Sequence, residues 1–457
     1  MTAKPTFASV IANRGFLNLW INQILVQWSF NSLNFTLILW VFQLTDSNTA
    51  VSALLFAVFL PTVIFGLFTG VLVDISDRRK IIMMINFCLS VLFLSLIFFK
   101  GSYPAILIIT FLVNALGQFY STAEASAIPI VVKRDQLMVA NSLFSITLYS
   151  AFLIGFGLAG PLINHLGIDS VFALGGIVLA IAFLLSLAFP SIKSIPDQEG
   201  RKLILALAEK KYSQIRQIAI SEISDTIRLI RGKLAVMTSI MILAGIQMVT
   251  GVLAVLVPGF LEKSLQIKAT DASYILVIPL GLGIVIGSLI LGKLGKNFIR
   301  RRLVAKGILF AGLMLFLVGI APFISPAINY FRHPQPVPFF YQLPLSKILA
   351  VGSFLVGMAI VSILVPSQTV LQENTPQQDR GKVFAVLGVA MSGLPLIPIF
   401  LSGILADLFG TTVIFIGLGF MIVLVGLFGL KPSWFFHEEH LPYNVREFLG
   451  LGHWEKE

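Results

Sequence analysis

Hydrophobic residues in this chain come in long runs that short polar stretches separate. About 20 apolar residues in a helix cross the roughly 30 Å of hydrocarbon in a bilayer. Runs of at least about that length lie near residues 16–43, 49–74, 81–99, 104–130, 138–164, 170–190, 235–260, 271–295, 302–323, 346–371, 382–405 and 411–430. The pattern therefore predicts an all-α integral membrane protein with twelve transmembrane helices.

Composition agrees with this prediction. Hydrophobic residues make up 57% of the 457 residues and charged residues 12%, against about 25% charged in a soluble domain. A water-soluble fold could not bury that much apolar surface, so lipid must be the solvent for most of it. The net charge of +11 is spread between the apolar runs, which indicates contact with anionic lipid headgroups rather than with nucleic acid.

A polar stretch divides the twelve runs into two sets of six. We predict an N-terminal six-helix bundle over 1–190, a cytoplasmic basic linker with an amphipathic helix over 191–234, a C-terminal six-helix bundle over 235–430 and a cytoplasmic tail over 431–457. The later part of the linker places four isoleucines on one helical face: Ile220, Ile223, Ile227 and Ile230. Such a helix would lie along the inner membrane surface.

The distribution of Lys and Arg predicts the orientation. With the N-terminus inside, the outer segments hold few of the 32 basic residues, namely Lys100, Lys263, Lys268, Arg332 and Lys347. Lys and Arg accumulate in cytoplasmic loops. Both termini and the linker are therefore expected in the cytoplasm, and the protein in the plasma membrane, which in a bacterium is the inner membrane.

A short charged loop after the second run is the most distinctive motif. It reads Gly70-Val71-Leu72-Val73-Asp74-Ile75-Ser76-Asp77-Arg78-Arg79-Lys80. It resembles the loop between the second and third helices of Major Facilitator Superfamily transporters. With the twelve helices and the six-plus-six split, the resemblance covers nearly the whole chain. It implies the major facilitator fold of two pseudo-symmetric six-helix bundles.

Smaller motifs resemble the drug:proton antiporter branch that includes macrolide-type and siderophore-type exporters. They are Phe16-x-x-Leu19-Trp20-x-x-Gln23, Leu60-Pro61, Ala123-Glu124-Ala125, and Gln372-Glu373-x-x-Pro376 followed by Arg380-Gly381-Lys382. The resemblance implies a secondary-active transporter that exports amphipathic small molecules or drugs by alternating access, driven by protons. Two alternatives stay open: a dedicated exporter of one endogenous compound (a siderophore or a lysolipid), and a non-transporting membrane receptor or assembly factor.

The charged loop suggests a gate. Asp74 ends the second helix and could hydrogen-bond the start of the eleventh, near Arg380 and Gly381. By resemblance, this contact closes the cytoplasmic side and breaks when that side opens. The gating set is Gly70, Asp74, Arg78, Arg79, Lys80, Arg380 and Gly381. The alternative for the basic members is plain anchoring at the inner surface.

Polar side chains, most of them amides, recur at helical spacing on the helices that line the cavity in this superfamily. The first, fourth and seventh helices carry Gln23, Gln27, Asn31 and Asn34; Asn114 and Gln118; and Gln247 and Thr250. Amides that face lipid are costly, so they should face protein or water. We expect them to line the substrate cavity; the alternative is that they bond neighbouring helices.

Glu124 is the one carboxylate that the sequence places well inside a predicted helix. An ionised carboxylate there is costly unless a cation pairs with it. Glu124 is therefore a candidate proton-coupling residue. The alternative is a fixed ion pair with Arg78 or Arg79.

The remaining residues limit the chemistry. No Lys or Arg lies in the middle of a predicted span, which argues against multiply charged anions as substrates. The chain has no phosphate-binding Gly-x-x-x-x-Gly-Lys-Ser/Thr loop and no convincing set of metal ligands, so we expect no enzyme activity, cofactor or metal. The expected partners are a small amphipathic, neutral or weakly cationic substrate, protons and anionic lipids, with the protein as a monomer and no nucleic acid bound.

Overall fold

The structure is a computed structural model that describes residues 7–74, 76–133, 136–189, 230, 233–294, 300–330, 345–375 and 380–430. The linker before Ile230, residues 331–344 and the tail after Leu430 lie outside the described residues. The amphipathic linker helix predicted from Ile220 to Ile230 falls in that part except for Ile230, and it stays a prediction.

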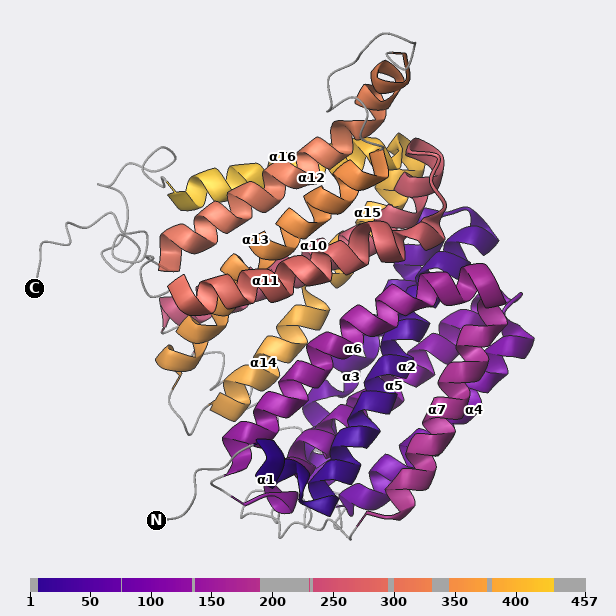
Figure 1. Ribbon diagram of the computed structural model, residues 1–457, viewed down its shortest axis with the longest axis vertical. Coiled ribbons are helices and arrows are strands. Elements are labelled where there is room, and N and C mark those ends of the chain that lie inside the picture. Colours follow the sequence, from indigo (N-terminus) through magenta and orange to yellow (C-terminus); the bar gives the residue numbers. More distant parts are fainter. Residues whose placement is uncertain are drawn as a thin grey trace, which may run out of the picture. The chain divides into compact units, whose positions relative to one another are not determined.

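The described chain is helical, and twelve of its helices are long and apolar enough to cross a membrane, as predicted. In the first half they are α2 (Arg14–Thr45), α3 (Asn48–Asp74), α4 (Arg78–Phe99), α5 (Tyr103–Val131), α6 (Leu137–Leu166) and α7 (Ile168–Leu187), after a short α1 (Phe7–Ile11). In the second half they are formed by α10 (Leu234–Gly259), α11 (Ile278–Leu294), α12 (Arg300–Tyr330), α13 (Leu345–Asn374), α14 (Arg380–Gly393) with α15 (Leu396–Phe409), and α16 (Thr411–Leu430). A π-helical turn, Phe260–Ser264, extends α10, and the turns Ala269–Asp271 and Ser273–Val277 lead into α11 (Figure 1).

Besides shifts of a few residues at the helix ends, two features differ from the sequence prediction. The run predicted over 302–323 continues as α12 through Pro326 to Tyr330, so the helix extends past its predicted end. The run predicted over 382–405 is broken between α14 and α15, where Leu394 and Pro395 form a turn. Proline interrupts the helical hydrogen bonds because it has no backbone N–H.

The chain divides into two compact units. Unit 1 contains residues 1–46 and 53–223, and unit 2 contains residues 47–52 and 224–457. The first turn of α3 therefore groups with the second half of the chain, whereas the rest of α3 groups with the first half.

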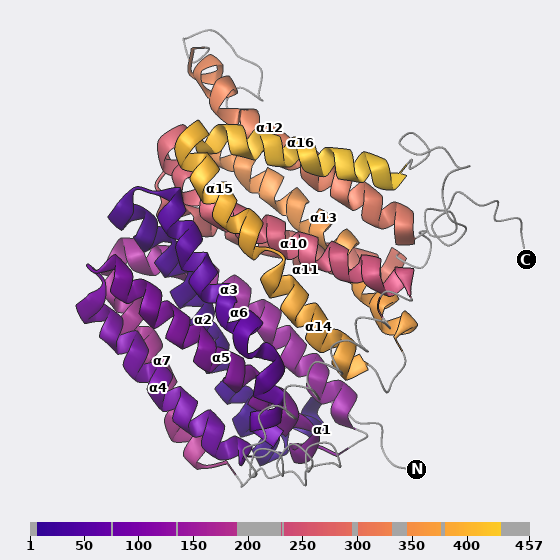
Figure 2. The same cartoon turned by 180° about the vertical axis from the view of Figure 1, so that it is seen from behind.

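In unit 1, α2 lies among α5, α6 and α7, and α4 lies beside α7 and α5 (Figures 1 and 2). Gly155 of α6 brings two of these helices into close contact. A Cβ at Gly155 would lie 2.6 Å from the Asn31 Cβ and 3.2 Å from the Trp28 carbonyl oxygen. Small residues allow membrane helices to approach in this way.

In unit 2, the tightest helix pair is α12 with α16 (Figure 2). Each helix carries two glycines seven residues apart at the contact. They allow the close approach, because a Cβ at any of them would lie within 3 Å of the backbone of the other helix. They are Gly312 and Gly319 on α12, and Gly419 and Gly426 on α16. Ile230, the first linker residue that the structure describes, packs with the start of α10, the end of α13 and the start of α14 around Val236, Leu371 and Val383.

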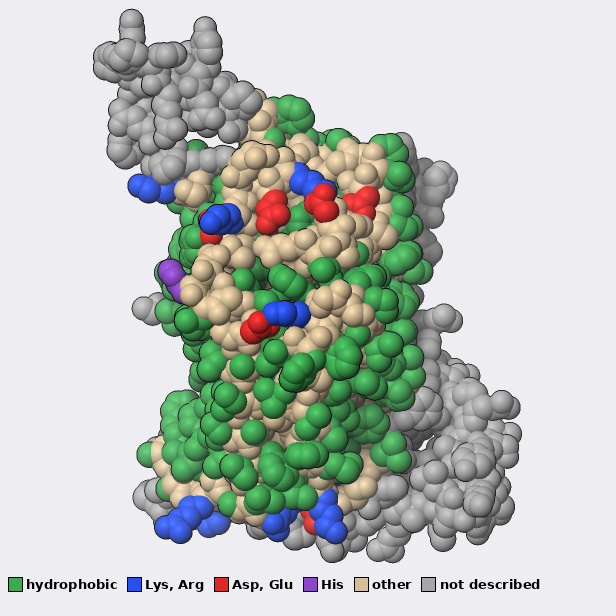
Figure 3. All heavy atoms as spheres, turned by 90° about the vertical axis from the view of Figure 1, so that its right-hand side faces the viewer, with side chains coloured by type: hydrophobic (Ala, Val, Ile, Leu, Met, Phe, Trp, Pro, Cys, Tyr) green, Lys and Arg blue, Asp and Glu red, His purple; other side chains and the backbone are tan. Residues whose placement is uncertain are grey.

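The outer surface of the helices is apolar. Hydrophobic side chains cover most of the face in Figure 3, and charged side chains gather in a few groups. Large side chains that would be hidden in a soluble protein are exposed, among them Phe98 at 84% and Ile397 at 70%. Lipid is the solvent that such a surface fits.

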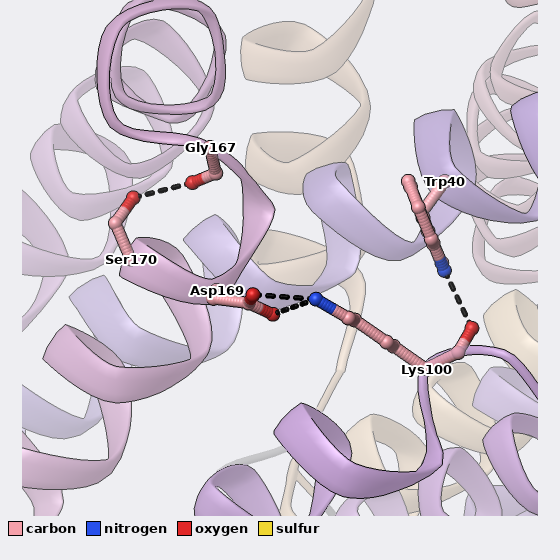
Figure 4. A network of polar contacts seen from close by, with 5 residues as sticks. All are labelled: Trp40, Lys100, Gly167, Asp169 and Ser170. Carbon is pink, nitrogen blue, oxygen red and sulfur yellow. Dashed lines mark hydrogen bonds and ion pairs between the residues drawn. The ribbon is translucent and has the colours of Figure 1, made fainter.

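One ion pair fixes an end of unit 1. The Lys100 ammonium, between α4 and α5, lies 2.6 and 2.5 Å from the two carboxylate oxygens of Asp169 at the start of α7. The Trp40 indole N–H of α2 donates to the Lys100 carbonyl oxygen at 2.7 Å. Figure 4 shows this network, which joins three helices at one end of the unit.

Candidate functional site

A polar pocket of about 170 Å³ lies within unit 1, between α2, α3 and α5. Its lining residues are Val26, Gln27, Phe30, Thr62, Asn114, Gly117, Gln118, Tyr120 and Ser121. Three of the amides predicted to line a cavity, Gln27, Asn114 and Gln118, therefore meet in one place. The pocket is smaller than the roughly 300 Å³ or more that a drug-sized ligand occupies, so within unit 1 it can hold one part of such a molecule.

Glycine shapes one wall of this pocket. A Cβ at Gly117 of α5 would lie 2.8 Å from the ring of Phe30 on α2. The ring of Phe30 also meets that of Phe93 edge-on, with centroids 6.3 Å apart. The absent side chain at Gly117 thus leaves the space in which an aromatic side chain borders the pocket.

The other predicted amides of α2 have different surroundings. Gln23 is buried, and its amide nitrogen lies 3.5 Å from the Phe144 carbonyl oxygen of α6, which fits the alternative of helix-to-helix bonding. Asn31 donates to the Gln27 carbonyl oxygen at 2.7 Å, within its own helix. Asn34 is half-buried, and its side-chain oxygen is enclosed without a hydrogen-bond donor.

Gln247 and Thr250 lie on α10 and belong to unit 2. Gln247 is half-buried and Thr250 is exposed. The Thr250 hydroxyl donates to the Ile246 carbonyl oxygen at 2.8 Å. Their membership of the substrate cavity stays a prediction.

Glu124 lies at one end of a buried polar cluster. It is 5% exposed, and its carboxyl oxygen Oε1 lies 2.9 Å from the Tyr120 hydroxyl oxygen. The same hydroxyl lies 2.9 Å from the Asn22 Oδ1 of α2. Asn86 of α4 donates to that Oδ1 at 3.1 Å, and Asn22 donates to the Ala182 carbonyl oxygen of α7 at 2.7 Å.

Sequence reasoning missed three members of this cluster: Asn22, Asn86 and Tyr120. Asn22 precedes the predicted amide Gln23, and Asn86 lies alone in an apolar run. An isolated amide inside a membrane helix is itself a signal of a buried partner. Tyr120 gave no signal of this kind, because tyrosine is common at both buried and interfacial positions.

The basic residues of the predicted gating loop bond within unit 1. Arg78 is 3% exposed, and its Nε donates to the Ser126 hydroxyl of α5 at 2.8 Å. The Arg79 guanidinium donates to the Leu187 carbonyl oxygen of α7 at 2.6 Å, and Lys80 is exposed. In this arrangement the partner of the Glu124 carboxyl is Tyr120 rather than a cation.

For the other members of the predicted gate, the structure describes the position of the backbone. Asp74 is the last residue of α3, and Arg380 and Gly381 begin α14. Their side chains lie outside the described residues, so the gating contact stays a prediction. A Cβ at Gly70 would meet no heavy atom of the described residues within 4 Å.

The sequence of this chain resembles those of known proteins. Its sequence matches the Major Facilitator Superfamily over residues 19–341 and again over residues 239–450. The chain belongs to this superfamily.

Two relatives of the superfamily illustrate the sequence likeness. The chain is 23% identical to "Macrolide efflux protein A" of Streptococcus pyogenes over 424 residues, which are 90% of this chain and 94% of the relative. It is 25% identical to the "Uncharacterized MFS-type transporter YkuC" of Bacillus subtilis (strain 168) over 325 residues, 68% of this chain and 71% of the relative.

Solved structures agree on the fold. A peptide transporter POT crystallised with sulfate aligns with a TM-score of 0.68 at 12% identity, covering 94% of this chain and 98% of the other. The nucleoside transporter NupG aligns with a TM-score of 0.66 at 12% identity, covering 92% and 99%. This protein is therefore a multi-pass membrane transporter of the major facilitator type, as the resemblance implied.

Proposed function

We propose that this transporter exports amphipathic small molecules by alternating access, driven by protons. The observation that carries the proposal is the arrangement on α5. One helix holds the pocket residues Asn114 and Gln118 and, one to two turns beyond Gln118, the buried carboxyl of Glu124. Tyr120 borders the pocket and contacts Glu124. A substrate site and a proton site are thereby linked by a single side chain.

The pocket composition favours the substrate class. Of the described residues that line it, none carries a charge at neutral pH, and amides and hydroxyls stand beside Phe30 and Val26. Such a surface suits a neutral or weakly cationic molecule with one polar and one apolar part. An anion with several charges would need a fixed counter-charge there.

Export is favoured by the likeness to the macrolide efflux protein, which extends over nearly the whole chain. The basic residues of the loops favour cytoplasmic termini, contact with anionic lipid at the inner face and residence in a bacterial inner membrane. Proton entry from outside would then drive substrate out, with the protein acting as a monomer.

Transport in proteoliposomes tests the proposal. Purified protein, reconstituted with an imposed pH gradient, should move a macrolide or an amphipathic dye against its concentration gradient. Gln27→Leu should raise the KM for that substrate about 5- to 30-fold, which corresponds to the loss of about 1–2 kcal/mol from one hydrogen bond. Gln43→Leu, at an exposed position on the same helix, should leave the KM unchanged. Liposomes that show no protein-dependent flux would instead support a receptor or assembly role.

The proton coupling has its own test. Glu124→Gln should abolish uphill export while downhill exchange of the same dye continues, because the amide cannot release a proton. Glu262→Gln, in the turn after α10, is the matched control and should keep uphill export. Uphill export by Glu124→Gln at the wild-type rate would exclude Glu124 as the coupling residue.

A further inference from the structure

The hydrogen bonds around Glu124 can be counted, because the orientation of Asn22 is fixed. The Ala182 carbonyl oxygen can only accept, so the Asn22 side-chain atom 2.7 Å from it must be the amide nitrogen. The other atom, Oδ1, therefore faces the amide nitrogen of Asn86 and the Tyr120 hydroxyl. Oδ1 can only accept as well.

The Tyr120 hydroxyl has one proton and two acceptor lone pairs. It lies 2.9 Å from Asn22 Oδ1 and 2.9 Å from Glu124 Oε1. If Glu124 were ionised, one proton would have to serve two acceptors, and one of these close oxygen–oxygen contacts would lack a full hydrogen bond. A buried polar contact of that kind is unfavourable.

A proton on Glu124 gives each of the two contacts of the Tyr120 hydroxyl a hydrogen of its own. The Glu124 O–H then donates to the Tyr120 oxygen, and the Tyr120 O–H donates to Asn22 Oδ1. We infer that Glu124 is protonated in this conformation, and that Tyr120 is a positioning residue that transmits the loss of that proton to Asn22 on α2. This inference rests on the proposed role of Glu124 as the proton site.

In the described part of the chain, no cation from the neighbouring helices forms an ion pair with the Glu124 carboxyl. Arg78 of α4 is the nearby cation, and it donates to Ser126 on α5. The other groups that face the cluster are neutral: Asn86 from α4, Asn22 from α2 and the Ala182 carbonyl from α7. Hydrogen bonds rather than an ion pair therefore decide which form of Glu124 this arrangement stabilises.

Deprotonation of Glu124 would break the hydrogen bond that joins Tyr120 of α5 to Asn22 of α2, and both helices line the pocket. When the Glu124 proton leaves to water, the Tyr120 hydroxyl turns to donate to the carboxylate, and Asn22 Oδ1 keeps Asn86 as its donor. Asn22 lies one turn before Val26 and Gln27 on α2, and Tyr120 itself lines the pocket. The proton is thereby coupled to the position of pocket residues from two helices.

Infrared difference spectroscopy of the purified protein in lipid nanodiscs tests the inference without any transport. At neutral pH, Glu124→Gln should remove a C=O stretching band of a protonated carboxyl. Tyr120→Phe should shift that band to higher wavenumber, because the acid loses its hydrogen-bond acceptor. Tyr103→Phe, which removes a hydroxyl at the other end of the same helix, is the matched control and should leave the band in place.

Asn22→Leu provides a second variant of similar volume. It removes the acceptor that holds the Tyr120 proton away from the carboxylate, so the ratio of protonated to ionised Glu124 at neutral pH should fall about fivefold, or about 1 kcal/mol. A wild-type spectrum from which Glu124→Gln removes no such band would overturn the inference. An unshifted band in folded Tyr120→Phe protein, or an unchanged ratio in Asn22→Leu, would exclude the relay. A positive spectrum with no proton-driven flux would refute the proposed function alone.

Discussion

The first turn of α3 is held by a carboxylate from another helix, and this contact allows a quantitative prediction. Asp407 of α15 accepts five hydrogen bonds. The donors are the Ser47 hydroxyl at 2.7 Å, the backbone N–H of Asn48 at 2.9 Å and of Thr49 at 2.8 Å, the Asn48 amide at 2.8 Å and the Thr49 hydroxyl at 2.7 Å. All of these residues belong to unit 2.

The contact satisfies the groups that a helix start leaves free. The first N–H groups of a helix have no partner inside it. Asp407 takes those of Asn48 and Thr49, and the Ser47 hydroxyl accepts from the next one, Ala50, at 3.3 Å. Gly403, one turn earlier on α15, permits the approach, since a Cβ there would lie 2.6 Å from the Asn48 carbonyl oxygen.

Asp407→Ala should free this turn of α3. A capping side chain contributes about 1–2 kcal/mol, and its negative charge adds a favourable interaction with the positive end of the helix dipole. Because Asp407 is exposed to solvent, solvent screens part of that second contribution. Taking about 1–2 kcal/mol as the loss, the local opening constant rises about 5- to 30-fold.

Hydrogen–deuterium exchange measured by mass spectrometry checks this value. A peptide that covers residues 47–52 should exchange about 5- to 30-fold faster in Asp407→Ala than in the wild type. Asp407→Asn should give a smaller increase, because the amide keeps one acceptor oxygen. Asp46→Asn, which removes a neighbouring exposed charge at a position where asparagine tolerates the left-handed φ of 50°, should leave the peptide unchanged. Equal exchange in the wild type and Asp407→Ala would refute the capping argument.

Three further predictions follow from other contacts. Gly155→Leu should severely lower the yield of folded protein, because the added side chain would meet the α2 backbone. Gly101→Leu is the control and should be tolerated, because a Cβ there would meet no heavy atom of the described residues within 4 Å. Size-exclusion profiles of the two variants measure the difference. Lys100→Met should lower the melting temperature by only a few degrees, because an ion pair that solvent reaches contributes about 1 kcal/mol or less, and high salt should reduce the difference. Asp74→Asn should strongly reduce turnover in the vesicle assay with little loss of folded protein if Asp74 is part of the gate, and full turnover would remove it from that role.

The positions of the helices could be predicted from the sequence, because each span must be long enough and apolar enough to cross the bilayer. The prediction of 411–430 matches α16 from end to end, and the first helix predicted over 16–43 differs from α2 by two residues at each end. The predicted helix ends and breaks were wrong where hydropathy alone does not indicate how far a helix extends. Pro326 lies inside α12 although proline usually ends a helix, and Pro395 breaks a run whose hydropathy is continuous.

Part of the candidate site was also predictable. The amides of α2 and α5 had to face away from lipid, and their helical spacing placed Gln27, Asn114 and Gln118 on faces that meet at the pocket. Glu124 stood out as a carboxyl in an apolar run. The family followed from the loop that ends at Lys80 and from the count of apolar runs.

Only the tertiary structure decided which polar groups pair. The sequence suggested Arg78 as a partner for Glu124. In the fold, Arg78 donates to the Ser126 hydroxyl, and the Glu124 carboxyl contacts the Tyr120 hydroxyl. Asp407 and Ser47, which lie 360 positions apart in the sequence, meet at the start of one helix. The physical reason is that a bilayer constrains each span separately through its length and its apolar surface. The hydrogen bonds between spans depend on rotations and close approaches that no single helix encodes.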